Sequence, residues 1–263
     1  MSSNEEFIRE RYKNPAGEDA RSSLSRANGL EFLYTKKLVG EYIDKNASVA
    51  EIGCATGHYG MYFADKCRDY TGIDLTPESI ELFREKIKQN GLTNITAAVG
   101  DATRLDNIKD SRFDVVLCLG PMYHLPPEER EAVFSECKRI CKQNGVIVFS
   151  YINKVGAYIK GCILTPSKYP DKTVNDFILN RGVDDIHSEV FFFTMPEVME
   201  ERAKTHGLTV LKNAGVNFTF AEKLINDMTD EQFKAWLEIA DFMCGHPSCT
   251  GFSIHALLIC RKS

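Results

Sequence analysis

Long apolar runs are missing from this 263-residue sequence, and no stretch reaches the ~18 uninterrupted apolar residues of a membrane span. Positive charge is scarce as well, since 32 Lys and Arg residues stand against 37 Asp and Glu residues, for a formal net charge of −5. Nucleic acids and anionic membranes bind basic surfaces, so neither is expected as a partner. The length and the 43% hydrophobic content suit one α/β domain with a small lid.

A secretory signal is also lacking, because the residues from Met1 to Glu10 are mostly polar, with three acidic side chains. The nine cysteines are scattered, and Cys54, Cys118 and Cys260 sit inside apolar runs. Scattered cysteines without a signal predict reduced thiols rather than a disulfide framework. We therefore expect a cytoplasmic protein.

Candidate strands alternate with helical patterns from Leu30 to Arg261, which is typical of a parallel sheet with crossover helices. Early strands are expected at residues 48–52, 70–73, 95–99, 115–119 and 146–151. Helices are expected at 30–45, from Pro77 with Thr76 as N-cap, and from Pro126 to an end at Gly145. A helix at 196–206, a strand at 208–218, a helix at 230–243 and a strand at 253–261 follow. The last two strands predict a sheet that ends in a reversed hairpin.

Acidic residues follow three successive strands. The first strand ends in Glu51 and runs into a turn from Gly53 to Gly57, whose small residues let the backbone approach a ligand closely. Asp74 ends the second strand, where a carboxylate accepts hydrogen bonds from ribose hydroxyls in nucleotide-binding α/β folds. Asp101 follows the third strand and is placed to meet an adenine amino group. Together they predict one nucleoside-binding crevice.

Simpler interpretations stay open at this point. A glycine-rich turn is often only a tight turn, and Asp74 and Asp101 also suit helix caps. The run from Ala55 to Gly60 approximates a dinucleotide-binding motif with Asp74 suitably downstream, which would indicate a nicotinamide cofactor. That alternative leaves Asp101 without a role, and Gly53 already occupies the tight-turn position.

Several motifs carry a family resemblance that spans most of the chain. The runs EIGCATG (51–57), ID (73–74), GDA (100–102) and FDVVLC (113–118) resemble the successive motifs of class I S-adenosylmethionine-dependent methyltransferases. The run LGPMYHL (119–125) resembles the GPxYHL signature of a bacterial small-molecule subgroup. Residues 251–262 are similar to the last strand of that subgroup.

The resemblance implies a doubly wound, mostly parallel Rossmann-like sheet with a reversed last strand and a small cap. It divides the chain into a helical lid segment (1–29), a cofactor-binding core (30–152), a cap insertion over the acceptor pocket (153–194) and the rest of the core sheet (195–263). The implied cofactor is S-adenosyl-L-methionine. Ala55 is one departure, because the family usually has glycine there.

The resemblance also assigns roles to residues. Gly53 to Gly57 would face the methionine part, Asp74 the ribose, and Asp101 with Ala102 the adenine. Leu119 would bind the amine through its carbonyl, and Tyr12 would close the site. The full set expected to bind cofactor is Tyr12, Glu51, Gly53, Cys54, Ala55, Gly57, Asp74, Leu75, Asp101, Ala102 and Leu119.

Acceptor chemistry is harder to derive, since methyl transfer chiefly needs alignment and a base is optional. His124 follows the fourth strand, and an unperturbed pKa of about 6.5 would suit removal of an acceptor proton. It could instead only seat the acceptor or hold the loop. Tyr123 is expected to pack on the acceptor or cap the methionine end. Phenylalanines 191–193 predict either an apolar pocket wall or a buried strand.

Metal binding is not expected. Cys244, His246 and Cys249 with His255 invite a metal interpretation, but their spacing does not match the usual zinc arrangements. His255 is expected to be an ordinary sheet residue, and Cys137 with Cys141 to belong to the core.

The expected function is methyl transfer to a small-molecule acceptor, without nucleic acid or membrane as partner. The alternatives are an NAD-dependent oxidoreductase, a module that binds the cofactor without catalysis, and a protein-methylating enzyme with a long open groove. The acceptor and the oligomeric state are left open.

Overall fold

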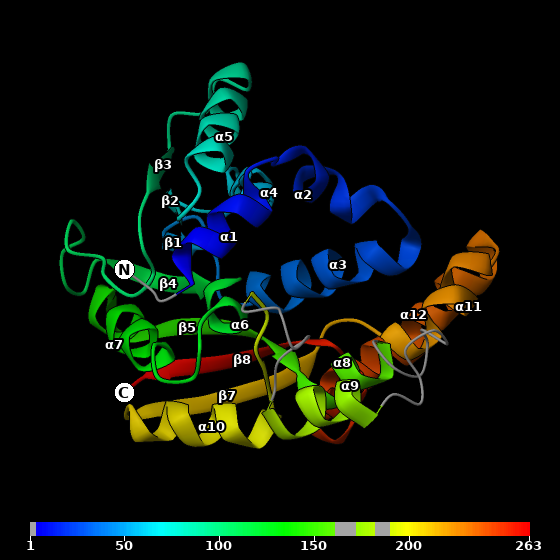
Figure 1. Cartoon of the computed structure of the whole chain (residues 1–263). Coiled ribbons are helices and arrows are strands. Elements are labelled where there is room, and N and C mark those ends of the chain that lie inside the picture. Colours follow the sequence, from blue (N-terminus) through cyan, green and yellow to red (C-terminus); the bar gives the residue numbers. More distant parts are fainter. Residues whose placement is uncertain (1–3, 161–171, 182–189) are drawn as a thin grey trace.

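One mixed sheet forms the centre of the protein. The computed structural model describes residues 4–160, 172–181 and 190–263, and Figure 1 shows their arrangement. The strands lie in the order β3-β2-β1-β4-β5-β8-β7, with β6 beside the end of β5. Their bounds are β1 Ser48–Ile52, β2 Asp69–Asp74, β3 Ile95–Val99, β4 Phe113–Cys118, β5 Cys141–Asn153, β6 Phe193–Thr194, β7 Leu208–Gly215 and β8 His255–Lys262.

The directions of the strands in the sheet follow the prediction. Strands β1 to β5 pair in parallel, whereas β8 is antiparallel to both β5 and β7. The reversed hairpin at the end of the sheet is therefore confirmed, and so is the Rossmann-like α/β architecture. In such sheets ligands bind outside the carboxyl ends of the parallel strands.

Helices cover both faces, because alternate strand residues point to opposite sides. Val115 and Leu117 of β4 belong to one apolar cluster, and Val116 and Cys118 to the other. The first cluster packs under α3 (Arg26–Gly40), α4 (His58–Phe63), α5 (Pro77–Gln89) and α12 (Asp230–Gly245). The second packs under α7 (Arg130–Ile140) and α10 (Pro196–Thr205). Burial on both faces explains the strongly apolar strands.

Short helices complete the structure around the carboxyl edge of the sheet. They are α1 Glu5–Tyr12, α2 Ala16–Ala20, α6 Pro121–His124, α8 Lys154–Tyr158, α9 Lys172–Asp176 and α11 Glu222–Asp227. In Figure 1, α1 and α2 lie together over the end of the sheet from which α6 emerges. None of the helices in the described ranges combines the length and apolarity of a membrane crossing.

Two helices, α3 and α7, differ from their predicted bounds by four or more residues at each end. The helix expected to run from Pro126 to Gly145 covers only Arg130–Ile140, and Gly145 lies inside β5, which already begins at Cys141. Helix α3 begins at Arg26 rather than Leu30, because Ser25 is its N-cap and its hydroxyl accepts a hydrogen bond from Asn28 N at 3.2 Å. Such side-chain caps stabilise the first turn.

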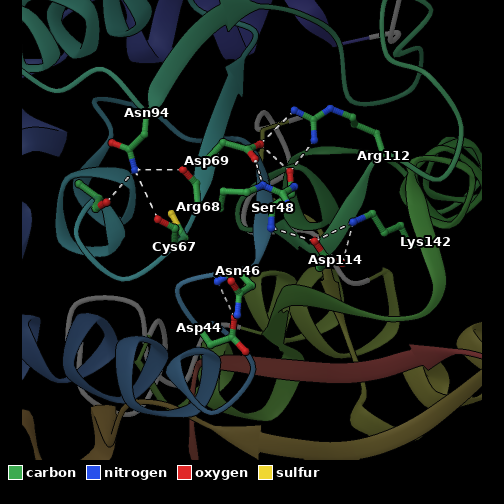
Figure 2. A network of polar contacts seen from close by, with 11 residues as sticks. Asp44, Asn46, Ser48, Cys67, Arg68, Asp69, Asn94, Arg112, Asp114 and Lys142 are labelled. Atoms are coloured by element: carbon green, nitrogen blue, oxygen red, sulfur yellow. Dashed lines mark hydrogen bonds and ion pairs between the residues drawn. The ribbon is translucent and has the colours of Figure 1, made fainter.

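Polar side chains tie the amino ends of the strands together (Figure 2). Ser48 Oγ donates to Asp69 Oδ1 at 2.5 Å and accepts from Arg112 Nη1 at 2.6 Å. Asp114 accepts from Ser48 N at 2.9 Å and pairs with Lys142 Nζ at 2.8 Å. This network fixes the edge of the sheet opposite the carboxyl ends, and it serves below as a structural control.

Candidate active site

A cavity of about 650 Å³ lies at the carboxyl ends of β1, β2, β3 and β4. Its volume is in the range of small-molecule sites. The turn after each of these strands contributes to its wall, and so do Ile8, Arg11 and Tyr12 of α1. The expected site residues on the wall are Tyr12, Glu51, Gly53, Cys54, Ala55, Asp74, Leu75, Asp101, Ala102, Leu119, Tyr123 and His124. The structure thus brings twelve of the thirteen expected residues to one place.

The turn from β1 to α4 needs its small residues. Gly53 has φ +80°, and a Cβ there would lie 2.6 Å from Pro121 Cδ and 2.9 Å from Leu119 O. Ala55 has φ +44°, in the left-handed region that an alanine enters at a cost of about 1–2 kcal/mol. The family's usual glycine would adopt this conformation without that cost.

Gly57 is the expected residue that does not line the cavity. A Cβ at this position would lie 2.0 Å from Phe83 Cδ2, and its φ is +80°. Glycine is therefore required here by packing between α4 and α5 and by the backbone conformation. Its contribution to a ligand site is indirect, through the turn that it allows.

The two aspartates hold the turns and still face the cavity. Asp74 accepts hydrogen bonds from Ala55 N at 2.8 Å and Thr76 N at 2.9 Å, and burial raises its pKa. Thr76 occupies the N-cap position of α5 as expected, but its side chain caps no backbone N–H. Asp101 Oδ1 accepts from Thr103 N at 2.9 Å. A carboxylate has about four lone-pair sites, so each aspartate retains capacity for a ligand.

Glu51 is the most deeply buried acid of the three. Only 1% of it is exposed, and Tyr70 donates a hydrogen bond to its Oε2 at 2.6 Å. Burial, together with the charge of Asp74, raises the pKa of Glu51 to about 8 despite the bond from Tyr70. The Glu51 carboxyl is therefore mainly protonated at neutral pH in this structure, and a nearby cation would favour its ionisation.

His124 differs from the free base that the sequence suggested. Burial lowers its pKa to about 4, and both ring nitrogens have partners. Nδ1 lies 2.8 Å from the carbonyl oxygen of Val190 and must donate to it, so Nε2 accepts from the hydroxyl of Tyr12 at 3.0 Å. Asn4 Nδ2 also donates to His124 O at 2.5 Å. The N-terminal segment is thus fastened to the α6 turn.

A partly buried polar cluster, which sequence analysis missed, lines the cavity beside this pair. Arg21 donates to Glu31 Oε2 at 2.6 Å and to Glu18 Oε1 at 2.8 Å. Burial would raise the pKa of Glu31, but His255 and Arg21 hold it at about 2. Burial also lowers the pKa of His255, so this histidine is neutral at pH 7 and Arg21 is the lasting cation.

His255 lies in β8 opposite Ile152 of β5, so it is a sheet residue as expected, and it also lines the cavity. The spacing of α3 offered a signal for Glu31, a charged side chain four residues before the buried Thr35. Arg21 lies in a short 3-10 turn (Arg21–Ser23), whose sequence has no periodic pattern to mark it.

The cysteines take structural positions. Cys137 and Cys141 are fully buried in the core, as predicted. Across the ranges that the structure describes, no group of three or more His, Cys, Asp or Glu side chains is arranged to hold a metal ion. Phe191 and Phe193 line the cavity, and Phe193 also lies in β6, so both interpretations of this run hold in part.

Comparison with known proteins gives a family for part of the chain. Residues 49–145 match the family model described as a methyltransferase domain. The ubiquinone biosynthesis O-methyltransferase of Actinobacillus pleuropneumoniae is 31% identical over 126 residues, which are 43% of this chain and 52% of that protein. Its counterpart from Neisseria meningitidis is 29% identical over 184 residues, 68% of this chain and 72% of that protein. The chain spans about half the length of the first such relatives.

Solved structures share the fold. An S-adenosylmethionine-dependent methyltransferase from Mesorhizobium loti superposes with a TM-score of 0.58 at 15% identity, covering 89% of this chain and 99% of that one. The cyclase SpnF gives 0.57 at 18% identity, covering 87% and 80%. Residues 49–145 therefore match a methyltransferase domain, and the chain around them shares the fold of the solved methyltransferases. The acidic side chains at three strand ends fit a cationic ligand with ribose hydroxyls and an amine, since such a cation would also favour ionisation of Glu51.

Proposed function

We propose that this chain is an enzyme that transfers a methyl group from S-adenosylmethionine to a small-molecule acceptor in the cavity. The observation that carries the proposal is the convergence of Glu51, Asp74 and Asp101, from three successive strand ends, on one covered cavity of about 650 Å³. A concave site of this size suits a small acceptor better than a protein segment or a nucleic acid. The scattered cysteines favour the cytoplasm.

The cofactor contacts follow from the placement of each residue. Asp74 would hold the ribose hydroxyls, Leu75 the adjoining wall, and Asp101 with Ala102 the adenine. The turn residues Gly53, Cys54 and Ala55, with Glu51 beneath them and the carbonyl of Leu119, would hold the methionine part. When bound, the cofactor supplies an electrophilic methyl group on a sulfonium.

Tyr12 and His124 offer a path for the acceptor proton. An acceptor hydroxyl next to Tyr12 would pass its proton to the Tyr12 oxygen while Tyr12 passes its own to His124 Nε2. A base of pKa about 4 is sufficient, because a hydroxyl oxygen becomes much more acidic as it forms a bond to carbon. Tyr123, whose ring lies 4.7 Å from that of His124, would align the acceptor. Alignment alone can supply about 7–11 kcal/mol.

The segments around the cavity complete the proposal. Residues 1–29 act as the lid through α1, and residues 153–194 act as the cap through Ala157, Ile178 and Phe191 on the wall. The run 119–125 forms the α6 turn and contributes Leu119, Tyr123 and His124, in keeping with the small-molecule subgroup signature. The relatives named O-methyltransferases support oxygen as the atom methylated.

Calorimetry and a transfer assay test the proposal. Wild-type protein should bind S-adenosylmethionine and its demethylated product but not NAD, and Asp74→Asn and Asp101→Asn should each weaken that binding at least 10-fold. With methyl-labelled cofactor, a panel of small phenols, amines, thiols and acids should reveal transfer. Unchanged affinity in both variants would remove the assigned contacts, and binding without any transfer would leave a cofactor-binding module.

A further inference from the structure

Resting on the proposed methyl transfer, we propose that Ser150 and His255 bind the acceptor, and that the acceptor is an uncharged aromatic molecule bearing hydroxyl groups. Both residues line the cavity. Their side chains place hydrogen-bonding groups on the part of the wall formed by β5 and β8, here called the floor. Neither was identified as a binding residue from the sequence.

Strand register brings the two residues together. In the antiparallel pair of β5 and β8, Ser150 lies opposite Leu257 and Ile152 lies opposite His255. Ser150 and His255 are therefore diagonal neighbours on the same face, about 7–8 Å apart in such ladders. Leu257 belongs to the cluster that packs under α3, so this is also the face on which Glu31 of α3 lies.

Ser150 has a hydroxyl that the fold does not use. The residue is 8% exposed, and its Oγ has no hydrogen-bond partner among the described residues. A buried hydroxyl without a partner destabilises the folded protein, so packing alone would favour alanine here. A ligand oxygen in the cavity would supply the missing partner.

His255 is held as a hydrogen-bond donor. Asn217 Oδ1 accepts from Ile254 N at 2.9 Å and from His255 N at 3.2 Å, which fixes the orientation of its amide. Asn217 Nδ2 is then directed at His255 Nδ1, 2.9 Å away, and donates to it. A neutral imidazole that accepts at Nδ1 carries its proton at Nε2. His255 consequently carries a donor group at Nε2, on a residue that lines the cavity.

Charge around this donor selects the class of ligand. Glu31 Oε2 lies 3.3 Å from His255 Nδ1, and this carboxylate stays ionised beside Arg21. Among the described wall residues, Glu31 is paired with Arg21 and Lys160 with Glu222, so a charged ligand group gains no free counter-charge beside His255. An ammonium group also has no lone pair to accept from Nε2–H. A neutral hydroxyl oxygen satisfies both His255 and Ser150.

The remaining wall suits an aromatic ring. Apolar and aromatic residues also line the cavity, namely Tyr123, Ile152, Phe191, Phe193, Val216 and Phe218. Aromatic and branched apolar side chains bind flat rings well, through burial and ring–ring contacts. A phenol or catechol therefore matches both the polar floor and the apolar wall.

Calorimetry with four probes of similar size tests the class, using wild-type protein saturated with the demethylated cofactor. Catechol should bind at least 10-fold more tightly than benzoate, benzylamine or toluene near neutral pH. Ser150→Ala and His255→Phe should each weaken catechol binding about 3- to 10-fold while leaving cofactor affinity within 2-fold. If benzoate or benzylamine binds best, the inference is wrong although the proposed function stands. Loss of cofactor binding by wild-type protein would instead overturn the proposed function.

Thermal unfolding separates a binding role from a structural one. Ser150→Ala should raise the melting temperature of the free protein by about 2–4 °C, because it removes an unpartnered buried hydroxyl. The matched control is Ser48→Ala, which breaks the network of Figure 2 and should lower the melting temperature without changing catechol affinity. A Ser150→Ala protein that is less stable and binds catechol normally would refute the inference.

Discussion

Tyr12 Oη lies 3.0 Å from His124 Nε2, although the two residues are 112 positions apart in the chain. The same segment sends Asn4 Nδ2 to His124 O, and the Arg11 guanidinium lies 4.6 Å from the centre of the Phe191 ring. The N-terminal helix therefore covers the cavity through contacts to the residue proposed to take the acceptor proton. In the proposed mechanism, closure of the lid would therefore also complete the proton path.

Removal of the Tyr12 hydroxyl tests this coupling. Tyr12→Phe keeps the ring that packs edge-on against His124 at 5.2 Å but breaks the path to Nε2. We expect kcat to fall about 100-fold, with cofactor affinity within 2-fold, measured with labelled methyl donor and calorimetry. Tyr62→Phe, on the outer side of α4, is the matched control and should leave kcat unchanged. A Tyr12→Phe enzyme with normal turnover would show that the proton leaves by another route.

Glu51 should make the stability of the free protein depend on pH. Burial raises its pKa from 4.5 to about 8, so between these values the folded state holds a proton that the unfolded state has lost. The stabilisation is complete below about pH 4.5 and is lost as the pH rises through 8, with an upper limit of about 5 kcal/mol.

Urea unfolding across this pH range measures the effect of Glu51. Glu51→Gln keeps an oxygen for the Tyr70 hydroxyl and should flatten the profile, making the variant more stable than wild type above pH 8. Glu81→Gln, an exposed change on α5, should leave the profile as it is in wild type. Parallel profiles for wild type and Glu51→Gln would contradict the assignment.

Sequence analysis predicted the sheet well, because the alternation of apolar residues and the turn residues that bound each strand are local features of the sequence. Strand β1 and strand β3 were predicted to the residue, and the acids at the ends of β1 and β2 lie where the pattern placed them. The end of α7 was misplaced because Gly145 resembles a helix terminator, whereas the ladder to β4 already begins at Cys141.

Sequence analysis did not predict the features of the site that depend on contacts between residues far apart in the chain. The pKa of His124 reflects burial under α1 and the carbonyl of Val190, neither of which is near it in the chain. Likewise, His255 reaches the cavity through the register of β8 on β5, and Arg21 pairs with Glu31 across a turn. Local patterns predict elements and strand ends, but long-range packing decides which side chains face a cavity.

Replacement of Ala55 by glycine should make the folded protein more stable. Its φ of +44° costs an alanine about 1–2 kcal/mol, whereas glycine pays only a smaller entropy cost in the unfolded chain. Ala55→Gly should therefore stabilise the protein by up to about 1 kcal/mol, measured by thermal unfolding. The control Ala16→Gly, in α2, should destabilise it, since glycine is unfavourable in helices. A destabilised Ala55→Gly protein would mean that the alanine methyl makes packing contacts that outweigh the backbone strain.

The lid segment has a second attachment to the core besides the contacts of Tyr12 and Asn4 with His124. Asp19 makes this second attachment and should help to hold the lid closed. Its carboxylate accepts a hydrogen bond from Thr56 Oγ1 at 2.6 Å and pairs with Lys86, while Lys86 Nζ also donates to Thr56 O at 3.1 Å. These contacts tie α2 to the turn that precedes α4 and to α5. Because the carboxylate is partly exposed, the tie contributes about 1 kcal/mol or less, enough to change lid opening several-fold without unfolding the core.

Hydrogen exchange on the Asp19→Asn variant measures that opening. We expect exchange to speed up about 3- to 5-fold in α1 and α2 but not in β1 or β4, and cofactor dissociation to quicken by a similar factor. Asp65→Asn breaks an exposed pair with Lys66 at the end of α4 and should change neither rate. If exchange in α1 stays at the wild-type rate, the contacts of Tyr12 and Asn4 with His124 alone keep the lid closed. Faster exchange throughout the sheet would instead show that Asp19 stabilises the whole fold.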